Sequence, residues 1–192
     1  MAPTNFGCFL GVDPGLHGGF ALISHDEIAQ AWPMPTTFRR GKEIVDEPAV
    51  GSLFKTRLHP AGIAYCVIEH VHSMKGQGVA SMFKFGRNAG LLIGLLIAHE
   101  IKFEETVPEI WQRSLGIHAR VKAPKGRGLF INFEPEETKS QYKKRLLAAA
   151  KQLFPSAFTG KSNEDSLKIA DALLIAEYTK RARTGYLGRP IL

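Results

Sequence analysis

The chain has 192 residues, 44% hydrophobic and 22% charged, which is ordinary for a globular protein that buries its own core. Two cysteines are too few for a disulfide framework, and no apolar run is long enough to span a bilayer, so we expect no membrane segment. The formal net charge of +7 favours a polyanionic partner, because a positive surface attracts phosphates.

The order of apolar and polar segments alternates between strand and helix patterns, which predicts an α/β fold. In chain order we expect strands at 9–12, 19–24 and 27–33, an exposed connection at 36–47, a helix that starts near Pro48, a buried strand at 62–70, a helix at 79–100, a strand at 101–107, and helices at 108–115, 136–153 and from Ser162 onward. The first two strands form a predicted hairpin. We expect one domain over residues 1–180 and a basic tail over 181–192.

Three carboxylates stand at positions that suit them poorly as structural residues. Asp13 ends an apolar strand pattern before a glycine-rich reversal, Glu69 ends the long central strand pattern, and Asp171 lies among alanines inside the last helix. For Asp13 a turn residue that bonds its own backbone is the alternative to a ligand of a divalent cation. Together the three acids predict a two-metal site for phosphodiester chemistry.

The chain resembles a RuvC-type Holliday-junction resolvase, of the branch found in bacteriophages and chloroplasts. The resemblance rests on segments in family order: Gly11–Gly15, Ile68–Val71, Gly76–Arg87, Pro108–Gly116 with Trp111, Thr138–Gln141 and Ala170–Tyr178. It implies a ribonuclease H-like fold with a mixed five-stranded sheet flanked by helices. It also implies a homodimer that resolves four-way DNA junctions with Mg²⁺, for which Mn²⁺ substitutes, and that leaves 5′ phosphates. Asp13, Glu69 and Asp171 would be the metal ligands.

The chain departs from the family pattern at one position. Relatives place a fourth acid three residues before the last aspartate, whereas this chain has Lys168 there. Three alternatives remain open: Lys168 stabilises the phosphate, Glu164 or Asp165 supplies the fourth oxygen ligand, or the site works poorly. In the last case the protein is a junction-binding protein with weak or no nuclease activity. An actin-like ATP-binding protein would need a second half that this length scarcely permits.

Basic and loop residues are the predicted DNA contacts. The segment 118–128 holds four cations and no acid, which predicts a phosphate-contacting loop or a solvated one. The resemblance adds the loop after Glu69, a cation near the scissile phosphate, and the long helix with Gly86 and Gly90 as the dimer contact. The full set is His72, Met74, Gln77, Arg87, Arg120, Lys122, Lys125, Arg127 and Lys139. Without a basic secretory start, we expect the protein in the cytoplasm or in its host's DNA-containing compartment.

Overall fold

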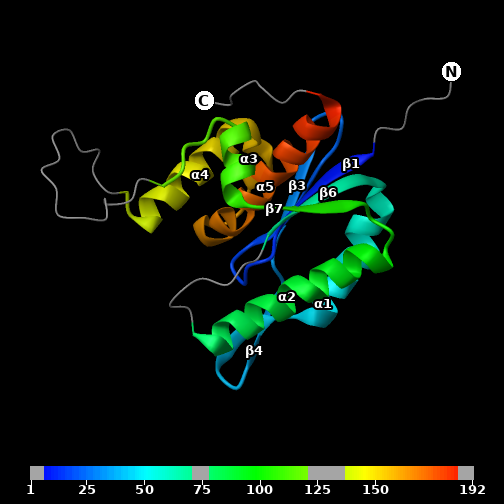
Figure 1. The fold of residues 1–192 in the computed structure, drawn as a ribbon, viewed down its shortest axis with the longest axis vertical. Coiled ribbons are helices and arrows are strands. Elements are labelled where there is room, and N and C mark those ends of the chain that lie inside the picture. Colours follow the sequence, from blue (N-terminus) through cyan, green and yellow to red (C-terminus); the bar gives the residue numbers. More distant parts are fainter. Residues whose placement is uncertain (1–6, 71–77, 121–136, 186–192) are drawn as a thin grey trace, which may run out of the picture.

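The computed structural model describes residues 7–70, 78–120 and 137–185. Five strands form a mixed sheet in the order β3-β2-β1-β6-β7, with helices on both faces (Figure 1). These strands are β1 (Cys8–Asp13), β2 (Gly19–Ile23), β3 (Ala29–Pro33), β6 (Ile63–Glu69) and β7 (Phe103–Thr106). β2 pairs antiparallel with β1 and β3, whereas β6 pairs parallel with β1 and β7. The predicted mixed five-stranded sheet is confirmed.

Helices cover the two faces of the sheet unequally. One face carries α3 (Pro108–Ser114), α4 (Lys139–Leu153) and α5 (Asn163–Thr184), and the other carries α1 (Glu47–Leu53) and α2 (Val79–Ala98) (Figure 1). Shorter turns lie at η1 (Phe54–Leu58), η2 (His59–Ala61) and η3 (Pro155–Phe158). Because side chains alternate along a strand, β2 sends Ala21 and Ile23 into the α5 core and Phe20 and Leu22 into the α1–α2 core.

Helix α5 lies against β1 with almost no side chain between them. A Cβ atom added at Gly11 would lie 2.3 Å from the Ala172 carbonyl oxygen and 2.3 Å from the Ala176 nitrogen. Only glycine leaves room for this approach, and the small alanines of α5 complete the contact. The approach brings the middle of α5 next to the strand that ends at Asp13.

Helix starts follow the capping residues of the sequence. Thr138 and Gln141 form a full capping box, so α4 begins at Lys139 rather than at the expected Glu136. At α5, Ser162 Oγ accepts the Asp165 N–H at 3.0 Å, whereas the Asp165 carboxylate accepts from the Ser162 hydroxyl instead of from its backbone. At the start of α5, only one of the two hydrogen bonds of a capping box is therefore present.

Segment 36–47 corrects one prediction. We expected an exposed connection, but β4 (Thr36–Arg39) and β5 (Lys42–Val45) pair as an antiparallel hairpin outside the main sheet. The expectation was wrong because these short, charged strands place only Val45 in the core and so carry little hydrophobic alternation. At the other end of the chain, α5 continues through Thr184, so residues 181–184 of the expected tail are helical. Within the described ranges, no helix is long and apolar enough to cross a membrane.

Candidate active site

Strand register and helix packing bring the three predicted acids to one edge of the sheet. β1 and β6 run parallel with Val12 opposite Ile68, so Asp13 and Glu69 follow at the same edge. Asp171 reaches this edge because α5 crosses β1 at Gly11. Asp171 is buried, with 6% of its surface exposed. The structure thus unites three carboxylates from segments far apart in the sequence.

The charges of the three acids act on one another. Burial and the negative charge of Asp171 raise the pKa of Asp13 to about 6, against the opposing effects of Lys143 and the Gly15 N–H. Burial, followed by the charges of Asp13 and Asp171, raises the pKa of Glu69 to about 8. Crowded carboxylates resist ionising together unless positive charge is added. The site therefore favours a bound cation.

Hydrogen bonds orient two of the carboxylates. The Gly15 N–H donates to Asp13 Oδ1 at 3.0 Å, so Asp13 makes the turn contact that was the alternative to a ligand role while it also lies among the other acids. The Trp111 Nε1–H donates to Glu69 Oε2 at 3.2 Å. Trp111 is fully buried and serves both as a core anchor and as a donor to this site.

The sequence analysis missed Lys143. From α4, its ammonium donates to Asp171 Oδ2 as an ion pair, while 48% of the Lys143 side chain remains exposed. Burial opposes its charge, but Asp171, Asp13 and Glu69 together raise the pKa of Lys143 above its ordinary value. A signal was available: Lys143 lies one helical turn before the buried Leu146 and Leu147, where a cation points toward the core side of α4.

Lys168 and Asp165 make contacts other than those we expected of a fourth active-site residue. Lys168 Nζ pairs with Glu164 Oε1 at 2.7 Å, so the cation bonded to Asp171 is Lys143 and not Lys168. Asp165 takes part in the start of α5 through Ser162. Roles for Lys168, Glu164 or Asp165 in the reaction stay predictions.

A divalent cation suits the chemistry of this site. Carboxylate oxygens are the ligands that hard divalent cations prefer, and the buried Asp171 Oδ1 has no hydrogen-bond partner. The arrangement is incomplete, however: among the described residues, no group of three or more His, Cys, Asp or Glu side chains is placed to hold a metal ion. The ammonium of Lys143 lies beside Asp171 instead. The chemistry of the donor atoms fits a divalent metal.

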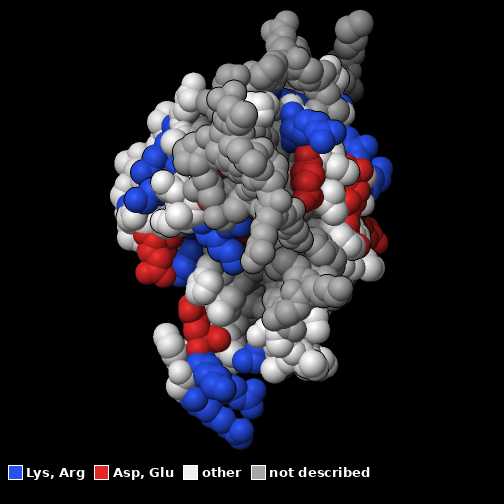
Figure 2. Space-filling model, turned by 60° about the vertical axis from the view of Figure 1, so that its left-hand side comes forward, with Lys and Arg blue, Asp and Glu red and all other residues white. Residues whose placement is uncertain are grey.

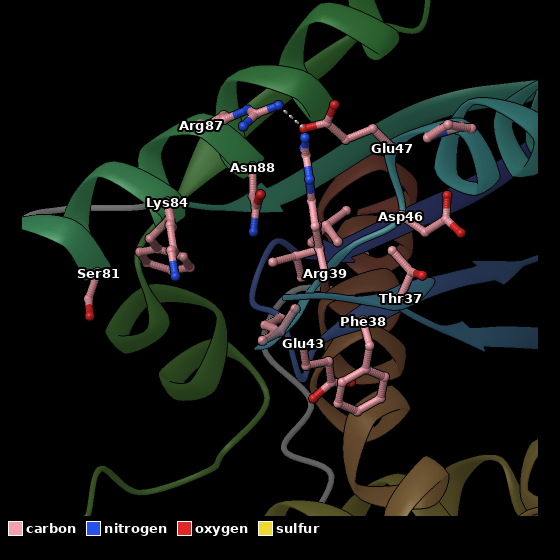
Figure 3. Close-up of a pocket in the computed structure, with 15 residues that line it drawn as sticks. Thr37, Phe38, Arg39, Glu43, Asp46, Glu47, Ser81, Lys84, Arg87 and Asn88 are labelled. Carbon is pink, nitrogen blue, oxygen red and sulfur yellow. Dashed lines mark ion pairs between the residues drawn. The ribbon is translucent and has the colours of Figure 1, made fainter. Parts of the chain in front are cut away.

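The predicted DNA contacts fall in three groups. Lys139 is exposed at the start of α4, and Arg120 is half-buried at the end of a described segment. Arg87 pairs with Glu47 at 2.6 Å and lines a groove of about 690 Å³ between α2 and the β4–β5 hairpin (Figure 3). The remaining predicted contacts lie outside the described residues: His72, Met74, Gln77, Lys122, Lys125 and Arg127.

Solved structures share this fold. A structure of Thermus thermophilus RuvC matches with a TM-score of 0.53 and 15% sequence identity over 93% of this chain and 96% of that one. The structure of T. thermophilus RuvC in complex with a Holliday junction substrate matches with a TM-score of 0.52 and 14% identity over the same shares. The chain has the RuvC fold. No protein-family model matches the sequence, and no curated protein matches it either.

The expected ribonuclease H-like, RuvC-type architecture is therefore confirmed. At 14–15% identity the likeness speaks for the fold alone. Evidence for what the chain acts on therefore comes from its own residues. The three acids that converge at the edge of the sheet are the strongest such evidence.

Proposed function

We propose that the chain is a metal-dependent endonuclease that resolves four-way DNA junctions. The observation that carries the proposal is the convergence of Asp13, Glu69 and Asp171 at one edge of a RuvC-type sheet. A protein with the same fold has been solved with a Holliday junction substrate, which supports branched DNA as the substrate class. The net charge of +7 suits a DNA partner.

In this proposal each residue has a defined task. Asp13, Glu69 and Asp171 would hold Mg²⁺, with Mn²⁺ as a substitute. When bound, such ions polarise phosphate oxygens and lower the pKa of a coordinated water. Trp111 holds Glu69 in position through its indole N–H, and the Gly15 N–H does the same for Asp13. The half-exposed ammonium of Lys143 contacts the negative phosphate once DNA enters.

Cleavage of a labelled four-way junction, compared with a linear duplex, tests the proposal. Wild-type protein should cut the junction in Mg²⁺ or Mn²⁺ and leave it intact in EDTA. Asp13→Asn, Glu69→Gln and Asp171→Asn should each abolish cleavage and keep junction binding, because removing negative charge does not weaken affinity for a polyanion. Asp26→Asn, at an exposed turn between β2 and β3, is the matched control. Near-normal cleavage by one of the three variants would remove that residue from the site.

A junction-binding protein without nuclease activity is the second candidate. The observation in its favour is the Lys143–Asp171 ion pair, which places an ammonium beside a proposed metal ligand. The same assay separates the candidates. Tight junction binding with no cleavage in either metal, by protein that is fully folded, would support this candidate and overturn the nuclease.

We also propose that the protein acts as a homodimer through α2. One stripe of this helix exposes Phe83, Gly86, Gly90 and Ile97, and a Cβ atom added at either glycine meets nothing within 4 Å. A two-fold dimer would present two equivalent sites to the paired strands of a junction. Sedimentation should show a dimer for the wild type and a monomer for Gly90→Arg. A wild-type monomer at working concentrations would contradict this proposal.

A further inference from the structure

The tip of the β4–β5 hairpin concentrates positive charge. Arg39, Arg40 and Lys42 occupy three of four consecutive positions, and all three are exposed. Figure 2 shows a cluster of basic side chains at the lower end of the molecule, the end at which Figure 1 places β4. Because the three side chains are exposed, packing against the main sheet or the core does not explain why they are basic.

Two features of the tip work against the stability of the hairpin. Arg39 stands directly opposite Lys42, and like charges in such cross-strand pairs repel. Arg40 has a φ of 52° and Gly41 a φ of 71°, the pattern of a type I′ turn, for which Asn-Gly is the favoured pair. An arginine in the left-handed region is conformationally unfavourable. The sequence thus retains charge at positions where folding alone would favour other residues.

No acid of the described residues neutralises the tip cations, whereas acids do pair with several basic residues elsewhere. Seven other basic residues form ion pairs with acids: Arg87, Lys143, Arg145, Lys168, Lys180, Arg181 and Arg183. Within residues 7–70, 78–120 and 137–185, Arg39, Arg40 and Lys42 form no ion pair. Three unpaired cations gathered at one hairpin tip suit an anionic partner.

The β4–β5 hairpin begins at the same edge of the sheet as the three acids. Asp13 pairs with Gly19 and Gly19 pairs with Pro33, the last residue of β3. The next residue, Met34, donates its N–H to the Gly18 carbonyl at 2.8 Å, which ties the base of the hairpin to the turn after Asp13. The groove between the hairpin and α2 is lined by Arg39 and Lys84 (Figure 3). Leu16, three residues after Asp13 in the sequence, also lines it.

An aromatic ring accompanies these cations. Phe38 precedes Arg39 in β4 and exposes 77% of its surface. Exposed aromatic rings beside basic residues are typical of nucleic-acid surfaces, where the ring packs on sugars or bases. We propose that the β4–β5 hairpin is a DNA-binding arm. Arg39, Arg40 and Lys42 contact phosphates of the DNA duplex beside the cleaved strand, and Phe38 packs against sugars or bases of the same duplex. The inference rests on the proposed action on branched DNA.

Fluorescence anisotropy with a labelled four-way junction, in EDTA and over a range of salt concentrations, measures the effect. Replacing Arg39, Arg40 and Lys42 together by alanine should weaken binding on the order of tenfold at moderate salt. Each lost phosphate contact reduces the slope of log affinity against log salt by about 0.9, so the slope should become shallower by about 2.7. The matched control replaces Lys55, Arg57 and Lys102, exposed cations at the opposite edge of the sheet, and should retain the wild-type slope.

Two single variants separate binding from folding. Arg40→Asn introduces the residue that a type I′ turn favours, so thermal stability should be kept or raised while junction affinity falls by a few fold. Phe38→Ala should weaken binding about threefold to tenfold with an unchanged salt slope, because no charge is removed. A variant that loses affinity only in proportion to lost folded protein would indicate a structural hairpin and overturn the inference.

The outcomes also distinguish this arm from the nuclease proposal. If wild-type protein cuts junctions and the triple alanine variant binds them with wild-type affinity and slope, the arm is wrong and the nuclease stands. If the triple variant changes the sedimentation of the protein but not its DNA binding, the hairpin contacts protein, and the arm is again wrong. If no cleavage occurs but the slope becomes shallower as expected, the arm stands and the nuclease fails.

Discussion

The two longest described helices, α5 and α2, pack on opposite faces of one sheet in opposite ways. In α5, residues 169–179 form an unbroken buried run, so the helix is covered on all sides. In α2 only Ala89, Leu92 and Leu96 are buried, whereas Phe83 and Ile97 expose 72% and 63% of their surface. A helix buried all round is part of the core, and a helix buried along one stripe has a face left for another molecule.

This difference separates the tasks of the two faces. On the α5 side, residues of β1, β6 and α4 surround Asp171 and hold its carboxylate near Asp13 and Glu69. On the α2 side, Leu92 and Leu96 pack into the core, while the opposite stripe of the helix offers glycine and apolar side chains to solvent. We therefore expect substitutions around α5 to change chemistry and folding, and substitutions on the open stripe of α2 to change assembly.

Among substitutions that leave the three acids in place, the largest effect should come from Lys143, which reaches Asp171 from α4. Lys143→Met removes the cation that contacts the phosphate in our proposal, and the junction-cleavage rate should fall about 100-fold or more, as for other lost electrostatic contacts in catalysis. Single-turnover cleavage at saturating protein measures the change, and unfolding curves correct for the buried Asp171 that is left without its partner.

Lys144→Met removes the same charge from the neighbouring exposed position and should cleave nearly as the wild type does. The result would also decide between the two lysines of this region. A wild-type rate for Lys143→Met together with a slow Lys168→Ala would restore the role that the sequence first suggested for Lys168.

Gly11→Ala should damage folding most. Its methyl group would overlap the backbone of α5 at 2.3 Å, and forced overpacking in a core costs about 3 kcal/mol. In a chain of this size the melting temperature should fall by about 6–12 °C. Gly51→Ala, in α1, is the control, because a Cβ atom there meets nothing within 4 Å. Equal melting temperatures for the two variants would mean that α5 does not depend on close contact with β1.

Glu69→Gln should change the pH dependence of stability in metal-free buffer. The folded protein raises the pKa of Glu69 from 4.5 to about 8, so between these values the folded state holds a proton that the unfolded state has lost. The wild type therefore loses stability as pH rises through this window, and glutamine removes the loss. We expect the variant and the wild type to have equal free energies of unfolding at pH 4, and the variant to be more stable by about 2 kcal/mol at pH 9. This gain is less than the full pKa shift implies, because the side chain is partly solvated.

Thermal unfolding at pH 4, 6.5 and 9 in EDTA measures this. Glu109→Gln, at an exposed position of α3, removes the same charge and provides the control. A Glu69→Gln curve parallel to that of the wild type across the whole range would show that the acids do not crowd one another in solution.

Most of the fold was predictable because it follows local patterns. The apolar runs that became β1, β2 and β6, the cap at Ser162 and the proline at the start of α3 each determine structure within a few residues. The β4–β5 hairpin was not found, because its strands pair only with each other and contribute only Val45 to the core among several charged residues. Its turn depends on Arg40 in a conformation that the residue type does not favour.

The site was predictable in its acids and not in its cation. Asp13, Glu69 and Asp171 stood out because each carboxylate contradicts its local pattern. Lys143 did not stand out, because lysine is common on helix surfaces and its partner is 28 residues away in the sequence. The departure from the family pattern drew attention to Lys168, but the nearby Glu164 forms an ion pair with it one helical turn away. Which of the two lysines pairs with Asp171 depends on which acids lie near each lysine in the folded chain. The sequence alone does not contain these distances.

The smallest effect is expected at Gly90, on the open stripe of α2. Because a Cβ atom there meets nothing within 4 Å, Gly90→Ala should stabilise the helix by about 0.5–1 kcal/mol in monomeric protein. The same methyl group would separate two α2 helices that approach closely in a dimer, so the dimer should become weaker. Urea unfolding at low protein concentration and sedimentation at high concentration measure the two effects. A loss of stability at every concentration would show that this stripe is covered within the chain itself, and the contrast between α2 and α5 would then disappear.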